Sequence, residues 1–446
     1  MCGIFGINNN KNASFLAYIS LYSLQHRGQE SCGIVSCSDK GFNYYNGMGL
    51  VQEVFNREII SELKGELAIG HVRYSTTGSS SILNAQPIFL KTRFGDLAIA
   101  HNGNIVNSKV LREKLSSQGS IFQTTSDSEI IAHLISRSRK NNFTDALIEG
   151  VLKLKGAFSF IFLRKGEIIA IRDPWGFRPL VIGKNNKSWA FASETTALDC
   201  IGYKYIGEVM PGEVVIASSK NIKRIRYSKV ERFYRCIFET VYFARPDSIV
   251  LNKTVARARY QIGKYLAMEA RDIKADIVSG VPDSGTPYAL GFSEESKIPY
   301  APVFMKNHYA PRSFLQPEQT LREFIAELKL ATIKDSVKEK EIILIDDSIV
   351  RGTTSKKIIS KLRSSGAKKI TFLVASPPII GSCFYGIDTP TESELIANKM
   401  KLKEIKKFIG VDELRYISMK NLVKGCGDGD TNFCCACFNK KYPVEG

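Results

Sequence analysis

The sequence lacks any long hydrophobic run. Its apolar stretches are short, and none of them approaches the roughly 20 apolar residues that a membrane span needs. The first residues also lack the basic segment followed by an apolar segment that marks a secretory signal. These absences predict a cytoplasmic protein with no membrane partner. A length of 446 residues suits two or three domains.

A concentrated basic segment is also missing, although the chain as a whole is basic. Lys and Arg number 62 against 44 Asp and Glu, which gives a net charge of +18. The basic residues are dispersed and often lie beside acids, as in "SVKEKE", a pattern typical of solvated helix faces. We therefore expect no nucleic-acid partner, and a small, highly phosphorylated substrate would use part of this charge.

The ten cysteines do not indicate a disulfide framework, because the chain shows no secretory signal. Four of them crowd the C-terminal end, and these are Cys426, Cys434, Cys435 and Cys437. Such clustering favours a metal or cluster site.

The apolar pattern changes near the middle of the chain. Before that point, short β-like runs such as "AFSFIFL" are separated by turn residues and by helical stretches such as 126–140. After it, apolar runs such as "EIILIDD" alternate with helical patterns such as 354–365, which predicts a parallel α/β sheet. We predict two domains, 2–230 and 231–446.

A cysteine stands second, behind a methionine that cells commonly remove. Loss of Met1 would give Cys2 a free α-amine, whose pKa of about 7.7–8.0 lets part of it accept the thiol's proton near neutrality. An isolated Met-Cys is more often only the start of an edge strand. The rest of the chain has to decide between the two interpretations.

Four polar clusters follow Cys2, and these are "QHRGQES" (25–31), "GHVRYSTTG" (70–78), "HNGNI" (101–105) and "TTSDSE" (124–129). Singly, each has an ordinary explanation, such as a tight Asn-Gly turn or a helix cap. In this order, behind an N-terminal Cys-Gly-Ile, they resemble the glutamine amidotransferase domains of the N-terminal-nucleophile hydrolases. The resemblance implies an α+β domain built as an αββα sandwich.

The same resemblance implies roles for seven residues. Cys2 would attack the side-chain amide of glutamine, and Asn102 with the backbone N–H of Gly103 would stabilise the oxyanion. The other four would bind or surround the substrate: Arg73 at its α-carboxylate, Asp127 at its α-ammonium, and Arg27 and Gly28 in the loop beside the nucleophile.

The most specific stretch of the chain is "EIILIDDSIVRGTTSKKIISKL" (341–362). An apolar strand ends in Asp346 and Asp347, a short loop follows, and a helix is expected from about Ser355. Backbone N–H groups at a helix N-terminus bind anions, so the loop would hold a monophosphate, whereas the two carboxylates suit ribose hydroxyls, directly or through a divalent metal. From the acidic pair alone a simple helix cap would be favoured.

This stretch resembles the ribose-phosphate signature of the type I phosphoribosyltransferases. The resemblance assigns the phosphate loop to Arg351, Gly352, Thr353 and Thr354. It places Ser284, in "IVSGVPDSGTP" (277–287), beside Mg²⁺ and pyrophosphate, with Asp346 and Asp347 as the other Mg²⁺ residues. The segment 306–317 resembles a mobile loop in which Lys306 and Arg312 would offset charge on the leaving pyrophosphate.

One family joins these two domains in this order, the glutamine phosphoribosylpyrophosphate amidotransferases of purine synthesis, and the resemblance covers nearly the whole chain. It implies that ammonia released from glutamine at Cys2 passes internally to phosphoribosyl pyrophosphate, giving phosphoribosylamine, glutamate and pyrophosphate. It also implies a homotetramer inhibited by purine nucleotides. Two residues depart from the pattern: Glu327 replaces an Arg and Ala331 an Asn.

One branch of the family carries a [4Fe–4S] cluster, and its pattern falls on Cys236, Cys383, Cys434 and Cys437. Four thiolates would also accept zinc, and free cysteines are a further alternative. Because neither half-reaction moves electrons, a structural role is expected for the bound group. Two rival functions are a glutaminase with a different acceptor and a non-catalytic sensor of phosphoribosyl pyrophosphate.

Overall fold

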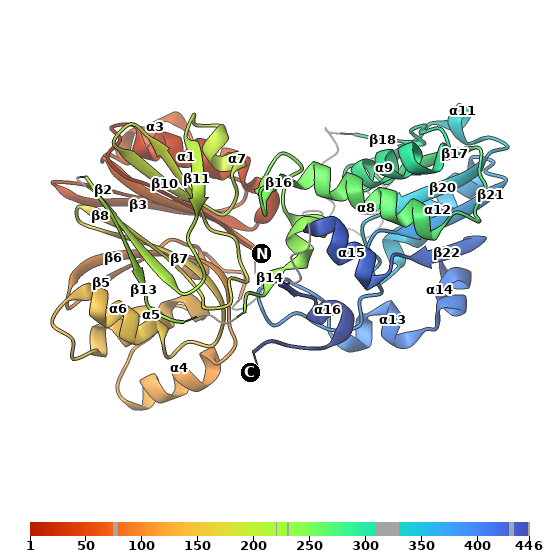
Figure 1. Ribbon diagram of the computed structural model, residues 1–446. Helices are drawn as coiled ribbons and strands as arrows, with labels where there is room; N and C mark the ends of the chain where they lie inside the picture. The colour runs from red at the N-terminus through yellow and green to blue at the C-terminus, as the bar shows by residue number, and fades with distance from the viewer. Residues whose placement is uncertain (75–78, 220, 230–231, 308–329, 428–431, 445–446) are drawn as a thin grey trace.

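The computed structural model describes residues 1–74, 79–219, 221–229, 232–307, 330–427 and 432–444. Figure 1 shows two lobes, one built from two stacked sheets between helices and the other from helices around a smaller sheet. The N-terminus lies between the lobes (Figure 1). The predicted domain boundary at 230/231 falls outside the described residues.

The first sheet of the N-terminal lobe is antiparallel and has the order β11-β9-β10-β1-β4-β2-β3. Its strands are β1 (Gly3–Ile7), β2 (Ser31–Ser38), β3 (Gly41–Met48), β4 (Leu67–Arg73), β9 (Val181–Asn185), β10 (Ser188–Ala192) and β11 (Lys204–Glu208). The helices over it are α1 (Ala13–Ser23), α2 (Val51–Val54), α3 (Arg57–Glu62) and α7 (Thr196–Asp199).

The second sheet is also antiparallel, with the order β13-β12-β8-β7-β6-β5. Its strands are β5 (Ile88–Thr92), β6 (Gly95–Ile105), β7 (Gly156–Arg164), β8 (Glu167–Arg172), β12 (Glu213–Ser218) and β13 (Ile222–Arg226). The helices α4 (Ser108–Ser117), α5 (Ile130–Arg137) and α6 (Phe143–Val151) cover its outer face.

Alternation along the strands explains why the two sheets stack. In β1, Ile4 belongs to the core between the sheets, together with Ile161 and Ile168, whereas its neighbour Phe5 belongs to the core under α1. Successive side chains of a strand point to opposite faces, so a strand that is apolar at every position buries both faces. The predicted αββα sandwich is confirmed.

The second lobe is centred on a parallel sheet of order β17-β20-β21-β22. Its strands are β17 (Ile277–Gly280), β20 (Glu341–Asp346), β21 (Lys369–Val374) and β22 (Glu413–Tyr416). Helices α8 (Val255–Glu269), α9 (Thr286–Ser296) and α15 (Met419–Cys426) pack with one core, and α12 (Thr353–Ser364) and α14 (Leu402–Ile409) with another. In β20, Ile343 belongs to the first core and Leu344 to the second. The predicted parallel α/β sheet is confirmed.

Short elements complete the chain. They are β14 (Arg235–Cys236) with β23 (Phe433–Cys434), β15 (Ile249–Val250) with β16 (Lys253–Thr254), β18 (Phe304–Lys306) with β19 (Leu330–Thr332), and the helices α11 (Lys334–Val337), α13 (Ile396–Lys399) and α16 (Ala436–Asn439). Pairing of β14 with β23 brings the segment that leaves the first lobe beside the C-terminal cysteines. Within the described part of the chain, no helix is long and apolar enough to cross a membrane.

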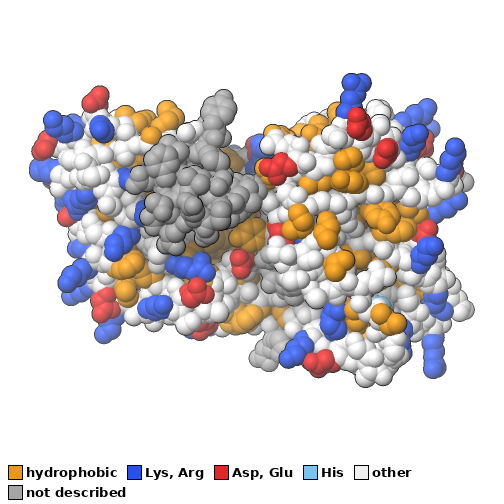
Figure 2. Space-filling view, turned by 180° about the vertical axis from the view of Figure 1, so that it is seen from behind, with side chains coloured by type: hydrophobic (Ala, Val, Ile, Leu, Met, Phe, Trp, Pro, Cys, Tyr) orange, Lys and Arg blue, Asp and Glu red, His pale blue; other side chains and the backbone are white. Residues whose placement is uncertain are grey.

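On the face shown in Figure 2, Lys and Arg side chains are spread over both lobes with Asp and Glu among them. The dispersion expected from the sequence is therefore visible on this face.

The crossing of α8 and α9 generates a stability prediction. A Cβ atom added at Gly263 would lie 2.0 Å from the carbonyl oxygen of Tyr288, so the helix backbones touch there. We expect Gly263→Ala to lower the free energy of unfolding by about 1–3 kcal/mol, as overpacking does. Urea denaturation followed by circular dichroism measures it. Arg257→Ala, at an exposed position of the same helix, is the control, and equal stability of both variants would contradict the close crossing.

Candidate active sites and the cysteine cavity

Cys2 lies at the entrance to β1, largely buried with 9% of its surface exposed. Its backbone N–H donates to Oδ1 of Asn102 at 3.3 Å, and its thiol donates to the carbonyl oxygen of Tyr74 at 3.6 Å. Burial raises the pKa of the Cys2 thiol, so the thiol needs a nearby base to become a nucleophile. With Met1 in place the α-amine belongs to Met1, and burial lowers the pKa of that amine to about 6.

Two residues of β6 offer donors beside this nucleophile. The side chain of Asn102 is buried, and its Nδ2 has no hydrogen-bond partner among the described residues. A buried N–H without a partner is costly, so it points to a ligand group that completes the site. Gly103 has a φ of +154°, and a Cβ there would lie 2.1 Å from the carbonyl oxygen of Ala157, so only glycine fits. This geometry supports the predicted oxyanion roles.

Arg73 and Asp127 lie near the same end of the sandwich. Arg73 ends β4 and forms an ion pair with Glu30, which the sequence analysis did not single out although it lies in the "QHRGQES" cluster. Asp127 accepts the backbone N–H of Ile105 at 2.9 Å and has His101 Nδ1 3.8 Å from its other oxygen. Both side chains are nearly buried, and their contacts with glutamine stay predictions.

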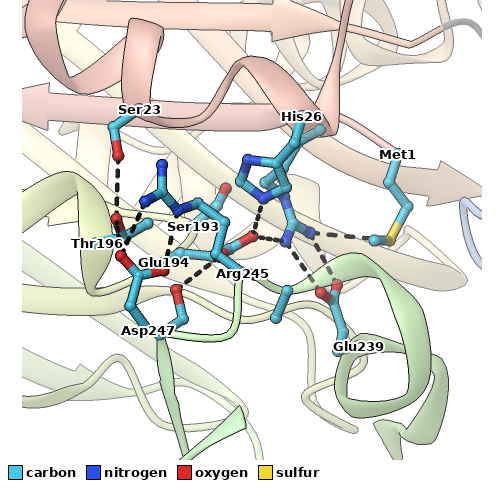
Figure 3. Close-up of polar contacts among 12 residues, drawn as sticks. Met1, Ser23, His26, Ser193, Glu194, Thr196, Glu239, Arg245 and Asp247 are labelled. Carbon is cyan, nitrogen blue, oxygen red and sulfur yellow. Dashed lines mark hydrogen bonds and ion pairs between the residues drawn. The ribbon is translucent and has the colours of Figure 1, made fainter. Parts of the chain in front are cut away.

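The structure places Arg27 beneath the nucleophile. Its guanidinium is fully buried, and its Nε donates to the carbonyl oxygen of Cys2 at 3.0 Å. Its two other nitrogens pair with Glu194 and with both oxygens of Glu239. Figure 3 shows Glu194, Glu239 and Met1 joined by these polar contacts. Burial alone would lower the pKa of Arg27, but the two carboxylates raise it.

Gly28 follows Arg27 and lies against β4. A Cβ at Gly28 would lie 2.6 Å from the backbone carbonyl of Val72, so the loop packs against the strand without room for a side chain. Sequence reasoning found the loop but missed Glu194 and Glu239, its carboxylate partners, because they lie far along the chain and match no motif of the first domain.

The second site stands at the carboxyl end of β20. Asp346 and Asp347 are buried, with 9% and 6% of their surfaces exposed. Burial and the neighbouring carboxylate of Asp347 raise the pKa of Asp346, and burial also raises the pKa of Asp347, although a hydrogen bond from Ser284 opposes that rise. The three residues predicted to hold Mg²⁺ therefore lie together. Across the part of the chain that the structure describes, the cysteines included, no group of three or more His, Cys, Asp or Glu is placed to hold a single metal ion.

The phosphate loop follows these carboxylates. Helix α12 begins at Thr353, two positions before the predicted Ser355, because Gly352 adopts a left-handed conformation with φ of +75° as its N-cap. Thr353 and Thr354 are exposed, and Arg351 pairs with Glu394 at 3.1 Å. The loop thus presents the N-terminus of a twelve-residue helix at the sheet edge expected for phosphate.

Lys306 ends β18 and forms an ion pair with Asp283, on the loop that contains Ser284. Arg312 and Glu327 lie outside the described residues. Ala331 pairs with Met305 between β19 and β18, and nothing in the structure explains its departure from the family pattern.

Tyr74 connects the two sites, and the sequence analysis did not single it out. Its carbonyl oxygen accepts the Cys2 thiol. Its side chain lies close enough to Asp388 and Arg351 for both to influence its pKa. Burial and Asp388 raise the pKa of Tyr74. One residue therefore touches both the nucleophile of the first lobe and the surroundings of the phosphate loop of the second.

The four cysteines predicted to bind a cluster line one cavity between the lobes. They are Cys236, Cys383, Cys434 and Cys437, and Arg178 lines the same cavity. Burial raises the pKa of Cys236 to about 11, and burial together with the neighbouring thiols raises the pKa of Cys437. A metal or cluster bound there would take these thiols as thiolates, because coordination removes the proton of a thiol. Cys435, next in sequence, is not among the lining residues.

Replacing Asn102 tests the oxyanion site. We expect Asn102→Ala to lower kcat for glutamine hydrolysis by about 10²–10³, the usual loss for one oxyanion donor. Asn104→Ala is the matched control, because the Nδ2 of Asn104 donates to the carbonyl oxygen of Phe384 instead. Steady-state glutaminase kinetics measure both variants, and equal losses would contradict a special position for Asn102.

Comparison with known proteins adds to this geometry. A glutamine amidotransferase domain family matches residues 71–200. Amidophosphoribosyltransferase 1 of Arabidopsis thaliana, a chloroplastic protein, is 45% identical over all of this chain and 79% of its own. The amidophosphoribosyltransferases of Bacillus subtilis and Methanocaldococcus jannaschii are 44% and 43% identical over all of this chain and 94% and 98% of theirs.

A solved structure agrees. Glutamine phosphoribosylpyrophosphate amidotransferase from B. subtilis, complexed with ADP and GMP, has a TM-score of 0.94 to this chain, with 44% identity over 100% of this chain and 98% of that one. Fold, length and sequence therefore match over both lobes. The chain belongs to the amidophosphoribosyltransferases, the enzymes of the first step of purine biosynthesis.

Proposed function

We propose that Cys2 releases ammonia from glutamine in the first lobe, and that the second lobe holds phosphoribosyl pyrophosphate for amination by that ammonia without its release to solvent. The observation that carries this division is the position of Tyr74. Its carbonyl oxygen accepts the Cys2 thiol, and its side chain lies close enough to Asp388 and to Arg351 of the phosphate loop for both to influence its pKa. The two sites therefore share one interface, as internal transfer requires.

In the glutamine half, removal of Met1 makes the backbone nitrogen of Cys2 the α-amine. This amine accepts the thiol's proton, and the sulfur attacks the amide carbon of glutamine. Asn102 Nδ2 and the Gly103 N–H donate to the oxyanion, the carbon–nitrogen bond breaks, and the amine returns its proton to the departing ammonia. Water then hydrolyses the thioester to glutamate. Arg73 and Asp127 hold the α-carboxylate and α-ammonium of the substrate.

Arg27 acts behind the nucleophile. All three of its nitrogens are used on the Cys2 carbonyl oxygen and two carboxylates. We therefore assign it to positioning Cys2 rather than to contact with glutamine.

In the ribosyl half, Arg351, Gly352, Thr353 and Thr354 hold the 5-phosphate, and Asp346 and Asp347 face the ribose. The buried carboxyls have raised pKa values, so a cation there would favour their ionised form, and oxygen donors of this kind suit Mg²⁺. When bound by Ser284, Asp346 and Asp347, Mg²⁺ would neutralise charge on pyrophosphate. Lys306 and Arg312 would add positive charge as the ribosyl carbon–oxygen bond breaks and ammonia adds.

The cysteine cavity supports a [4Fe–4S] cluster on Cys236, Cys383, Cys434 and Cys437, with zinc as the alternative. Its role here would be structural, since it would cross-link three separate segments of the chain. The solved B. subtilis relative is complexed with ADP and GMP, which supports the binding of purine nucleotides by this chain as well, and we propose that they inhibit it. A homotetrameric assembly stays a prediction from the family resemblance. A cytoplasmic location without nucleic-acid or membrane partners stays a prediction.

Cys2→Ala separates the two sites. We expect no glutamine-dependent pyrophosphate release but residual activity with free ammonia, because the second site does not need the thiol. A pyrophosphate assay with each nitrogen source measures this. Cys32→Ala, which removes another buried thiol of the same sheet, should keep glutamine use. Equal loss of both activities in Cys2→Ala would argue against two separable centres.

Asp347→Ala should produce the reverse pattern. Loss of a carboxylate that faces ribose and Mg²⁺ abolishes ribosyl transfer from either nitrogen source, while weak glutaminase activity remains. Glutamate and pyrophosphate release are measured side by side. The exposed Asp335→Ala is the control, and normal transfer by Asp347→Ala would overturn the assignment of this site.

Metal analysis tests the cysteine cavity. Protein purified without oxygen should hold about four iron and four sulfide per chain. Cys383→Ser should lose both, whereas Cys200→Ser, at an exposed cysteine, should keep them. One zinc per chain with no sulfide would refute the cluster.

A further inference from the structure

Arg178 is a buried arginine that neither half-reaction uses. It follows β8 in the loop that leads to β9, and its side chain is fully buried. Its Nε donates to the carbonyl oxygen of Tyr385 at 2.8 Å, and its Nη1 lies 3.4 Å from Glu239 Oε1 and also contacts Met1 Sδ. Its Nη2 is buried and has no hydrogen-bond partner among the described residues.

A guanidinium without solvent normally uses its donors, since a buried N–H without a partner costs about 1–3 kcal/mol. Arg178 lines the cavity that is lined by the four cysteines. The residue with the unpaired donor thus lines the same cavity as the acceptors that the proposed function adds there, the sulfurs of the bound cluster.

We propose that Nη2 of Arg178 donates a hydrogen bond to a sulfur of the cluster and that Arg178, through Glu239, links the cluster to the backbone of the nucleophile. This inference rests on the proposed cluster. Arg178 is a positioning residue in this scheme. The hydrogen bond and the positive charge favour the more negative, reduced cluster and limit its loss to oxidants.

The link to Cys2 runs through one shared carboxylate. Glu239 accepts from Arg178 through Oε1 and from Arg27 through both oxygens, and Arg27 donates to the Cys2 carbonyl oxygen. The sulfur of Met1 contacts both arginines, so removal of Met1 takes away a neighbour that they share. After that removal, Glu239 remains the group that holds the two guanidinium groups together.

Residues of the second lobe contact Arg178 and the residue before it. Tyr385 stacks on Phe177, the residue before Arg178, at 4.3 Å between ring centroids, and its hydroxyl donates to the carbonyl oxygen of Val444. Contacts from the C-terminal part of the chain therefore hold the Arg178 guanidinium and the preceding residue at the edge of the cavity.

The test uses Arg178→Gln and, as the conservative variant, Arg178→Lys, in full-length protein purified without oxygen. Iron, sulfide, the visible absorption of the cluster, its reduction midpoint and its rate of bleaching in air are measured. We expect Arg178→Gln to retain most of its iron but to bleach about tenfold faster in air. Its equilibrium constant for one-electron reduction of the cluster should fall about tenfold, which lowers the midpoint potential by about 59 mV. Arg178→Lys should have a bleaching rate and a midpoint potential between those of Arg178→Gln and the wild type. This conservative variant keeps the test valid if Arg178→Gln does not fold.

Arg172→Lys is the matched control. Arg172 is equally buried, pairs with Glu208 and also has an unpartnered nitrogen, Nε, among the described residues, but it does not line the cysteine cavity. Its variant should have the midpoint and bleaching rate of the wild type. Full iron content with unchanged midpoint and bleaching in both Arg178 variants would overturn this inference alone. Wild-type protein without iron and sulfide would overturn the proposed cluster and, with it, this inference.

Discussion

The buried guanidinium of Arg27 is the contact on which the arrangement of the two sites depends. It carries a charge without solvent, and such a charge is tolerated only where carboxylates and hydrogen bonds satisfy it. Glu194 of the first lobe and Glu239 of the segment leading to the second both supply that pairing, and the remaining donor holds the Cys2 carbonyl oxygen. The nucleophile is therefore fixed to the junction of the lobes and not to the first lobe alone.

This constraint explains why nitrogen transfer suits the fold. Ammonia that forms at a thiol on the junction is released next to the second lobe. Tyr74 lies between Cys2 in the first lobe and Asp388 in the second. The parallel sheet presents its acidic pair at the carboxyl end of β20, the edge where ligands of open α/β sheets bind. Each lobe thus supplies one half of the chemistry, and the junction supplies their coupling.

The sequence predicted most of what is local. Apolar runs that alternate with helical patterns predicted the parallel sheet, and the family resemblance implied the αββα sandwich. The stretch "IDDSIVRGTT" located the phosphate loop, although the left-handed Gly352 starts its helix two residues before the predicted position. The contacts that cross the junction could not be predicted in this way. Glu239 lies 212 residues from Arg27, and Glu194 lies 167 residues away, so no spacing rule connects them.

The same limit applies to single residues inside recognised motifs. Glu30 and Tyr74 stand in quoted clusters, yet their partners become visible only when the strands are assembled, because the pairing of β2 with β4 sets Glu30 beside Arg73. Arg178 belongs to no cluster that the sequence singled out. Its position against four cysteines from three separate segments depends on the packing of both lobes.

The central claim is that a liberated α-amine at Cys2, held by Arg27 at the junction, makes the thiol a nucleophile. Mass spectrometry of the mature N-terminus, before and after reaction with a glutamine analogue that alkylates thiols, tests it most directly. The account predicts a chain that begins at Cys2 and carries the label on that residue. A chain that keeps Met1, hydrolyses glutamine at full rate and takes the label elsewhere would contradict it.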